Sequence, residues 1–243
     1  MRGETRGPGH SLAPVPFCDL RRGAHGLSWC DRNHTRRRMT LQLDHIVVLG
    51  ETLEEATAHA ETAVGQPLVP GGTHERYGTH NHLVGLGGVY LEALAIDPGA
   101  MPPRDARWFG LDRFEGPARL ANWVCRVPDM DAALAALPMA GRPVELSRGR
   151  LRWVMSVPED GVLPFDGIFP ALIQWRSPVP AGAILSASGT RLDRLDVMHP
   201  EAGALESLLA PHLDAPGVRF RAAPAPGLRA EMIGAGGQRR VLQ

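Results

Sequence analysis

A histidine and a glutamate, each inside a short apolar run, are the residues of this sequence best suited to chemistry. His45 lies in residues 43–48 and Glu92 in residues 89–94. Both runs read as half-buried strands, and an ionisable side chain that faces into such a strand is costly unless something pairs with it. A histidine and a glutamate from separate strands can converge on a divalent metal ion or on a small polar ligand. We therefore expect the function to centre on these two residues.

The stretch between them, residues 71–82, is rich in glycine, histidine and asparagine. Its His74 could act as an acid or a base, because the pKa of histidine lies near neutral pH. Asn81 could contact a substrate, although both side chains could equally serve in local turn hydrogen bonds. We predict His74 and Glu92 as catalytic residues and Asn81 as a substrate contact.

Nucleotide binding is not expected. The glycine pairs at 71–72 and 87–88 do not form a GxGxxG pattern, and the chain has no lysine for a phosphate-binding loop, since all 26 basic residues are arginine. These are the features by which a nucleotide site would be recognised in a sequence. We therefore predict no nucleotide cofactor.

Composition narrows the class of partner. The formal net charge of the 243 residues is zero, which gives no bias towards nucleic acids or anionic membranes. No apolar run approaches the roughly 20 residues needed to cross a bilayer. Three cysteines are too few for a disulfide scaffold. We predict a cytoplasmic protein that acts on a small molecule, with no nucleic-acid or membrane partner.

Residues 1–38 differ in kind from the rest of the chain. They carry eight arginines against three acidic residues, a local charge of +5, and glycines and prolines interrupt every periodic pattern. We predict either a disordered extension or a translation start at Met39, which directly precedes the first convincing strand. A basic tail for an acidic partner and a small metal site formed by the cysteines and histidines of this segment are the alternatives.

The spacing of apolar residues after Met39 predicts two similar units, each a strand, a helix and two or three further strands. The first helix is predicted to begin after Thr52, which can form a capping box with Glu55, and to end at Gly65. The second helix is predicted to begin after Asp129. Strands are predicted at residues 41–49, 80–86, 89–96, 122–127, 144–146, 151–157 and 171–175.

Aligning the two units by their helices adds candidates. His45 and Asn122 each lie eight residues before the first apolar residue of the following helix. The alignment therefore matches His45 with Asn122, and Glu92 with Gln174 on the last strand of the second unit. Arg176 shares a strand face with Gln174, and it could either hold a carboxylate or phosphate at a cavity rim or belong to a solvated strand end.

A third and looser round of the same elements follows in residues 183–243, with a helix near Pro200. The predicted fold class is α+β, in which repeated βαβββ units form mixed curved sheets with helices on their outer faces. Residues 39–178 are expected to form the paired domain, with residues 183–243 packed on it. The strands of the third unit are predicted at residues 192–197, 218–222, 228–233 and 239–242.

Five short motifs lie on or beside the predicted strands: LDHIV (43–47), GGTH (71–74), YGTHN (77–81), YLE (90–92) and PALIQW (170–175). With these motifs and the repeated βαβββ plan, the chain resembles the vicinal oxygen chelate (VOC) superfamily, and within it a glyoxalase-like branch, over about residues 41–177. The resemblance implies the fold shared by glyoxalases, bleomycin-resistance proteins and dioxygenases. It also implies a substrate with vicinal oxygens, such as a dicarbonyl or hydroxy-carbonyl compound.

The resemblance also implies a site. In metal-dependent members, the first and last strands of paired units supply His, Glu or Gln ligands to one divalent ion. This implies His45, Glu92 and Gln174 as ligands of a Zn, Ni, Mn or Fe ion, and it leaves Asn122, a poor metal ligand, with Arg176 as substrate contacts. The implied activity is that of a lyase or isomerase in which the metal stabilises an enolate-like charge. The alternative is a metal-free protein that binds or sequesters a small molecule, and a homodimer is a further expectation.

Overall fold

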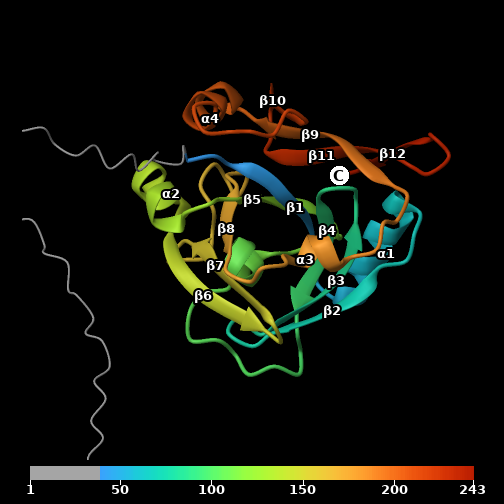
Figure 1. Ribbon diagram of the computed structural model, residues 1–243, viewed down its shortest axis with the longest axis horizontal. Helices are drawn as coiled ribbons and strands as arrows, with labels where there is room; N and C mark the ends of the chain where they lie inside the picture. The colour runs from blue at the N-terminus through green and yellow to red at the C-terminus, as the bar shows by residue number, and fades with distance from the viewer. Residues whose placement is uncertain (1–38) are drawn as a thin grey trace, which may run out of the picture. The chain divides into compact units, whose positions relative to one another are not determined.

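The computed structural model describes residues 39–243, and the expectations for residues 1–38 lie outside this range. The described residues form two β-sheets, one of eight strands and one of four (Figure 1). The strands of the larger sheet are β1 (Gln42–Leu49), β2 (Val69–His74), β3 (Thr79–Gly85), β4 (Tyr90–Ile96), β5 (Arg119–Arg126), β6 (Arg142–Arg148), β7 (Leu151–Val157) and β8 (Ala171–Trp175). Those of the smaller sheet are β9 (Arg191–His199), β10 (Val218–Ala222), β11 (Gly227–Ile233) and β12 (Arg239–Leu242).

Short helices connect the strands. Within residues 39–243, none is both long and apolar enough to cross a membrane. The first of them packs against β1, β3 and β4, and the second against β6, β7 and β8. They are α1 (Leu53–Val64), α2 (Met130–Ala136), α3 (Ala181–Ile184) and α4 (Ala202–Leu209), with 3-10 helices η1 (Trp108–Arg113) and η2 (Pro138–Ala140).

The larger sheet holds the two predicted units side by side. Its strand order is β2-β3-β4-β1-β5-β8-β7-β6, so each unit contributes four neighbouring strands. The first and last strands of each unit pair in parallel, β1 with β4 and β5 with β8. The two units join where β1 and β5 pair antiparallel. This mixed curved sheet with flanking helices confirms the predicted α+β class (Figure 1).

A helix follows the first strand of each unit, and both helices begin at the caps that the sequence predicts. Thr52 caps α1 by accepting a hydrogen bond from the N–H of Glu55, and Gly65 ends the helix in a left-handed conformation with φ 74°. Asp129 caps α2 by accepting from the N–H of Ala132. These caps satisfy N–H groups that have no partner inside the helix. They fix the point at which the chain leaves β1 and β5.

β2 is the strand that the sequence pattern does not reveal. Its two glycines are typical of a turn, yet the segment pairs antiparallel with β3, with a shift of register between Pro70 and Gly72. Position 71 needs glycine, because a Cβ there would lie 2.1 Å from Oδ1 of Asn81. The absent side chain lets the β2 backbone pass directly over this asparagine. His74 ends the strand beside it.

The third unit forms the smaller sheet with a different strand order, β10-β9-β11-β12. β11 contacts β5 and β12 contacts α1, while the rings of Trp123 and Phe220 meet edge to face at 6.4 Å. Apolar side chains from both sheets form one core. The third unit also holds the residue before β1, because Leu41 N–H donates to His212 O and Asp214 N–H donates to Leu41 O, each at 2.8 Å.

Candidate functional site

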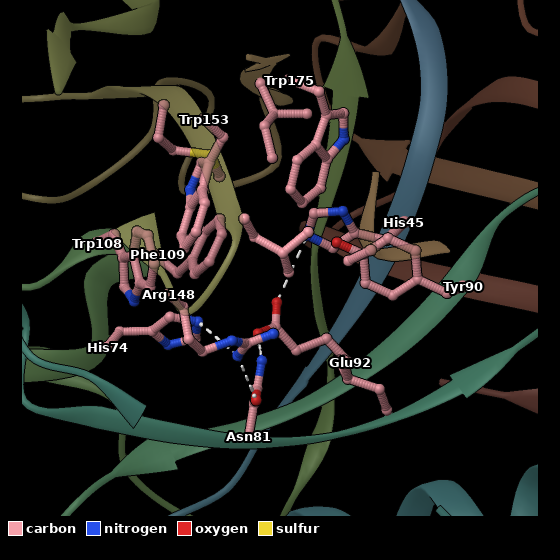
Figure 2. A pocket seen from close by; sticks show the side chains of 15 residues that line it. His45, His74, Asn81, Tyr90, Glu92, Trp108, Phe109, Arg148, Trp153 and Trp175 are labelled. Carbon is pink, nitrogen blue, oxygen red and sulfur yellow. Dashed lines mark hydrogen bonds and ion pairs between the residues drawn. The ribbon is translucent and has the colours of Figure 1, made fainter. Parts of the chain in front are cut away.

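A small cavity with a volume of ≈ 30 Å³ lies where the two units of the larger sheet face each other (Figure 2). The first unit supplies most of its polar side chains, and the second unit supplies much of its aromatic wall. Its polar lining residues are His45, His74, Asn81, Glu92 and Arg148, and its aromatic ones are Tyr90, Trp108, Phe109, Trp153 and Trp175.

His45 on β1 and Glu92 on β4 form a buried pair, with Nε2 of the histidine 3.4 Å from Oε2 of the glutamate. The other ring nitrogen, Nδ1, is 2.8 Å from Oδ1 of Asp44. Trp175 holds this aspartate from the far side, since its Nε1 donates to Oδ2 at 3.0 Å. Tyr90 stacks on the imidazole with ring centroids 4.4 Å apart. The histidine is therefore fixed by two carboxylates and an aromatic ring.

These contacts set the charges of the pair. Burial alone would lower the pKa of His45, but hydrogen bonds to Asp44 and Glu92 and their negative charges overcome it and raise the pKa to about 9. Burial alone would raise the pKa of Glu92, but the hydrogen bond and the charge of His45 lower it to about 2. At neutral pH the cavity thus holds an imidazolium paired with the carboxylate of Glu92.

A second chain of contacts runs from Glu92 to His74. Asn81 Nδ2 donates to Oε1 of Glu92 in a short hydrogen bond. Arg148 Nη1 donates to Oδ1 of Asn81 at 3.1 Å and lies 3.4 Å from Nε2 of His74. Nδ1 of His74 is 3.1 Å from Oγ1 of Thr79. Arginine can only donate, so Nε2 of His74 accepts and its proton lies on Nδ1.

His74 differs from His45 in charge. Burial lowers its pKa to about 4; the charge of Arg148 lowers it as well, while the charge of Glu92 acts in the opposite direction. His74 is therefore a neutral imidazole at neutral pH. The edge of its ring meets Trp108 at 4.9 Å, so it is held between an aromatic ring and a guanidinium.

The structure brings together four of the predicted site residues and leaves three outside. His45, His74, Asn81 and Glu92 all line the cavity (Figure 2). Gln174, Asn122 and Arg176 do not line it.

Each of these three has another location. Gln174 fixes the start of α2, since its Nε2 donates to the carbonyl of Pro128 at 2.9 Å and its Oε1 accepts from the N–H of Met130 at 3.0 Å. Asn122 donates to the carbonyl of Gly167 at 3.2 Å and borders a separate cavity. Arg176 follows the end of β8 and is exposed.

The register of the strands explains why Gln174 lies outside the cavity. The pairs His45–Val124 and Val47–Asn122 are related by a local twofold axis through the Ile46–Trp123 pair, so Asn122 is indeed the counterpart of His45. On the same axis Val124 is the counterpart of Val47. Val47 pairs with Glu92, whereas Val124 pairs with Ala171. The counterpart of Glu92 is therefore Ala171, and the alignment that matched Glu92 with Gln174 is wrong.

Asp44 and Arg148 are site residues that the apolar pattern does not identify. Neighbouring residues of a regular strand point to opposite faces, yet the strand has a shift of register between Leu43 and His45, and the side chains of Asp44 and His45 meet. Arg148 is the last residue of β6 and one of 26 arginines, and nothing in its local sequence distinguishes it. An acidic residue beside a buried histidine was the one available signal.

The donor set does not fit a divalent metal. Catalytic zinc sites use about three protein ligands, and within residues 39–243 no three His, Cys, Asp or Glu side chains are grouped to hold an ion. His45 and Glu92 supply two donors, and Gln174 is bound to backbone groups elsewhere. His74 cannot complete the set as placed, because the cationic guanidinium of Arg148 lies against its free nitrogen.

Comparison with known proteins gives a match over most of the chain. Residues 43–213 match the family described as a glyoxalase-like domain, and the curated proteins give no match. Among solved structures, a hypothetical protein from Staphylococcus aureus is 14% identical and has a TM-score of 0.56, with 84% of this chain and 98% of that chain covered. At such identity the likeness concerns the fold alone.

Two smaller proteins align less closely. Methylmalonyl-CoA epimerase from Mycobacterium tuberculosis is 20% identical with a TM-score of 0.37, covering 57% of this chain and 88% of its own. A hypothetical protein from Bacillus halodurans C-125 is 13% identical with a TM-score of 0.40, covering 58% of this chain and 97% of its own.

Proposed function

Because this chain belongs to the glyoxalase-like domain family of the VOC superfamily, we propose that it is an enzyme of the isomerase or lyase type that moves a proton on a substrate with vicinal oxygens. The observation that carries the proposal is the buried, charged His45–Glu92 pair, which lines a cavity that also contains the guanidinium of Arg148. Buried charges facing a cavity are characteristic of functional sites.

In the proposed reaction the substrate places its carbonyl and neighbouring oxygen against Arg148. The carboxylate of Glu92 accepts a proton from the adjacent carbon: the C–H bond breaks, an O–H bond forms on Glu92, and the electron pair moves to the carbonyl oxygen. Arg148 donates hydrogen bonds to the enolate oxygen that develops. Return of the proton to another atom completes an isomerisation, and loss of a neighbouring leaving group completes an elimination.

The hydrogen bonds that hold Glu92 must weaken before this carboxylate can accept a proton. A carboxylate with a pKa of about 2 is a weak base, since proton transfer is most effective when the pKa lies near the working pH. A bound substrate that displaces the Asn81 or His45 hydrogen bond from Glu92 raises its basicity. His74, neutral and in contact with Arg148, serves as a positioning residue for the guanidinium.

Proton–deuterium exchange tests the proposal without knowledge of the natural product. The protein is incubated in D₂O with 2-oxobutanoate, and deuterium at C3 is followed by NMR. We expect the Glu92→Gln variant to lose about 100-fold or more of the exchange rate. The control is Glu54→Gln, on the exposed side of α1, which should keep the full rate. Equal rates in wild type and Glu92→Gln would refute the proposal.

The same assay distinguishes the metal-free reaction from the metal-dependent one that the family resemblance implies. We expect the exchange rate to be unchanged by EDTA and by later addition of Mn, Ni, Zn or Fe, because the side chains around His45 offer too few donors. A rate that falls with EDTA and returns with one metal would establish the metal-dependent form instead.

A metal-free binding protein is the second candidate. It is favoured by the low pKa of Glu92 and by its hydrogen bonds to His45 and Asn81, which leave the carboxylate already satisfied. Such a protein would bind 2-oxo carboxylates but would not exchange their C3 protons.

A further inference from the structure

The cavity around His45 and Glu92, here the inner cavity, adjoins a larger one. This outer cavity has a volume of ≈ 760 Å³. The two cavities share part of their walls, so they are neighbouring spaces. The residues that line both are Leu83, Arg148, Leu151 and Ala181.

The volumes of the two cavities indicate that each accepts a different part of one substrate. A space of about 10–15 Å³ holds one water molecule, so the inner cavity, at ≈ 30 Å³, admits only a small reacting group. Ligand sites for larger molecules span roughly 300–1,000 Å³, and the outer cavity lies inside this range. A substrate that reaches Glu92 must therefore leave the rest of its body in the outer cavity.

The outer wall is apolar and comes from the connection between β8 and β9. Two of the six large apolar side chains that are exposed among the described residues lie on it, Val179 at 48% and Ile184 at 64% exposure. Leu185 and Leu151 extend the same surface. Exposed apolar side chains gathered beside a site mark the place of an apolar ligand group.

The charge of the outer cavity selects for anions. Arg148 and Arg150 are its only charged lining residues, and neither Asp nor Glu is among the described residues that line it. Arg148 stands at the boundary of the two cavities, and Arg150 lies on the outer side. A group that passes between them meets positive charge at both points.

We infer, on the basis of the proposed function, that the substrate is an amphipathic carboxylate. Its head, which bears the vicinal oxygens, lies between Arg148 and Glu92. Its unbranched apolar chain lies in the outer cavity along Ile184 and Val179. The site thus takes a longer molecule than a small dicarbonyl compound.

A homologous series of ligands tests this inference. Dissociation constants are measured by calorimetry for 2-oxobutanoate, 2-oxohexanoate, 2-oxooctanoate and 2-oxodecanoate. Each methylene that enters the apolar wall contributes about 0.8 kcal/mol, so we expect the affinity to rise by about fourfold per methylene. Constants that do not change with chain length, or no binding by any member of the series, would overturn the inference.

Two surface variants test whether the apolar chain of the ligand lies along the outer wall. We expect Ile184→Ser to weaken 2-oxodecanoate by about tenfold and to leave 2-oxobutanoate unchanged. The matched control is Met139→Ser, which also removes an exposed apolar side chain, 40% exposed, but lies outside both cavities. If the two variants weaken 2-oxodecanoate equally, the chain does not lie along Ile184.

Charge is tested in the same way. Arg150→Gln should weaken every member of the series by about threefold, as expected for a solvent-exposed ion pair. Arg104→Gln, at an exposed arginine away from both cavities, should have no effect. An unchanged affinity in Arg150→Gln would remove this residue from the inferred site.

The two proposals fail in different ways. Affinity that rises with chain length without C3 exchange supports the amphipathic ligand and refutes the enzyme. Exchange of 2-oxobutanoate with no gain from longer chains supports the enzyme and refutes the amphipathic ligand. The Glu92→Gln variant, which should lose exchange and keep the gain per methylene, separates the two directly.

Discussion

The two units of the larger sheet share one backbone plan and differ in their chemistry. At corresponding positions the first unit has His45 and Glu92, and the second has Asn122 and Ala171. The second unit contributes Arg148 and the tryptophans of β7 and β8 to the same cavity. One unit therefore holds the buried charged pair, and the other encloses it and supplies a cation. Repetition of a fold does not imply repetition of its site.

The energetics of buried charge account for part of this difference. A buried ion pair is maintained only where further hydrogen bonds satisfy both partners. The first unit provides them through Asp44 and Asn81. In the second unit, Oδ1 of Asn122 has no hydrogen-bond partner among the described residues. A second charged pair there would lack such support.

The largest effect expected from this comparison is on stability. His45→Ala leaves two carboxylates buried without their cation, and breaking a buried pair in this way costs about 3–5 kcal/mol. Asn122→Ala removes one hydrogen bond to Gly167 and should cost about 1 kcal/mol. Urea unfolding of the two variants measures both values. Equal losses of unfolding free energy in the two variants would show that the charged pair of the first unit stabilises the protein no more than the neutral Asn122 of the second.

The pH dependence of stability should also come from the first unit. The pKa of His45 rises from 6.5 to about 9 on folding, so its contribution is complete below pH 6.5 and is lost as the pH rises through 9. The pKa of His74 falls from 6.5 to about 4, so its contribution is complete above pH 6.5 and is lost as the pH falls through 4. Opposite shifts of two histidines therefore predict greatest stability near pH 6.5.

Thermal unfolding between pH 4 and pH 9 measures this profile. We expect Tm to fall by several degrees towards each end, since about 1 kcal/mol corresponds to 2–4 °C in a protein of this size. His74→Gln should flatten the acid side alone. A Tm that rises steadily from pH 6.5 to pH 9 would contradict the assignment of a positive charge to His45.

The smallest effect on the proposed reaction concerns Gln174, which lies on the second unit. Gln174→Ala removes the hydrogen bonds to Pro128 and Met130 and should cost about 1–2 kcal/mol of stability. The rate of C3 exchange should stay at the wild-type value, the reverse of the outcome for Glu92→Gln. Loss of exchange without loss of stability would return Gln174 to the site.

Much of the fold follows from local sequence. The helix caps at Thr52 and Asp129 and most strands lie where the apolar pattern predicts them. β2 was not predicted because Gly71 and Gly72 carry no side chains that would show an alternating pattern. The contact with Asn81, which only the folded structure shows, explains the glycine at position 71. Tertiary contact, rather than local preference, makes this segment a strand.

Only part of the site could be predicted from the sequence, because the rest depends on tertiary contacts. His45 and Glu92 stand out because ionisable residues rarely occur in apolar strands. Gln174 was matched with Glu92 because each lies on the last strand of its unit, but the register of β8 puts Ala171 at the position of Glu92, and Gln174 faces the other side of the strand. Arg148 reaches the cavity only through the pairing of the sheet, which no local pattern encodes.

The attachment of β1 to the third unit delays part of the stabilisation of this strand during synthesis. β1 carries His45, and the segment at its start is held by His212 and Asp214, with Gln42 Nε2 donating to Asp214 Oδ2 across 172 residues. Contacts so distant in sequence form late. A nascent chain that ends before Asp214 lacks these bonds, so the strand that bears the charged histidine is then held by its pairing with β4 and β5 alone.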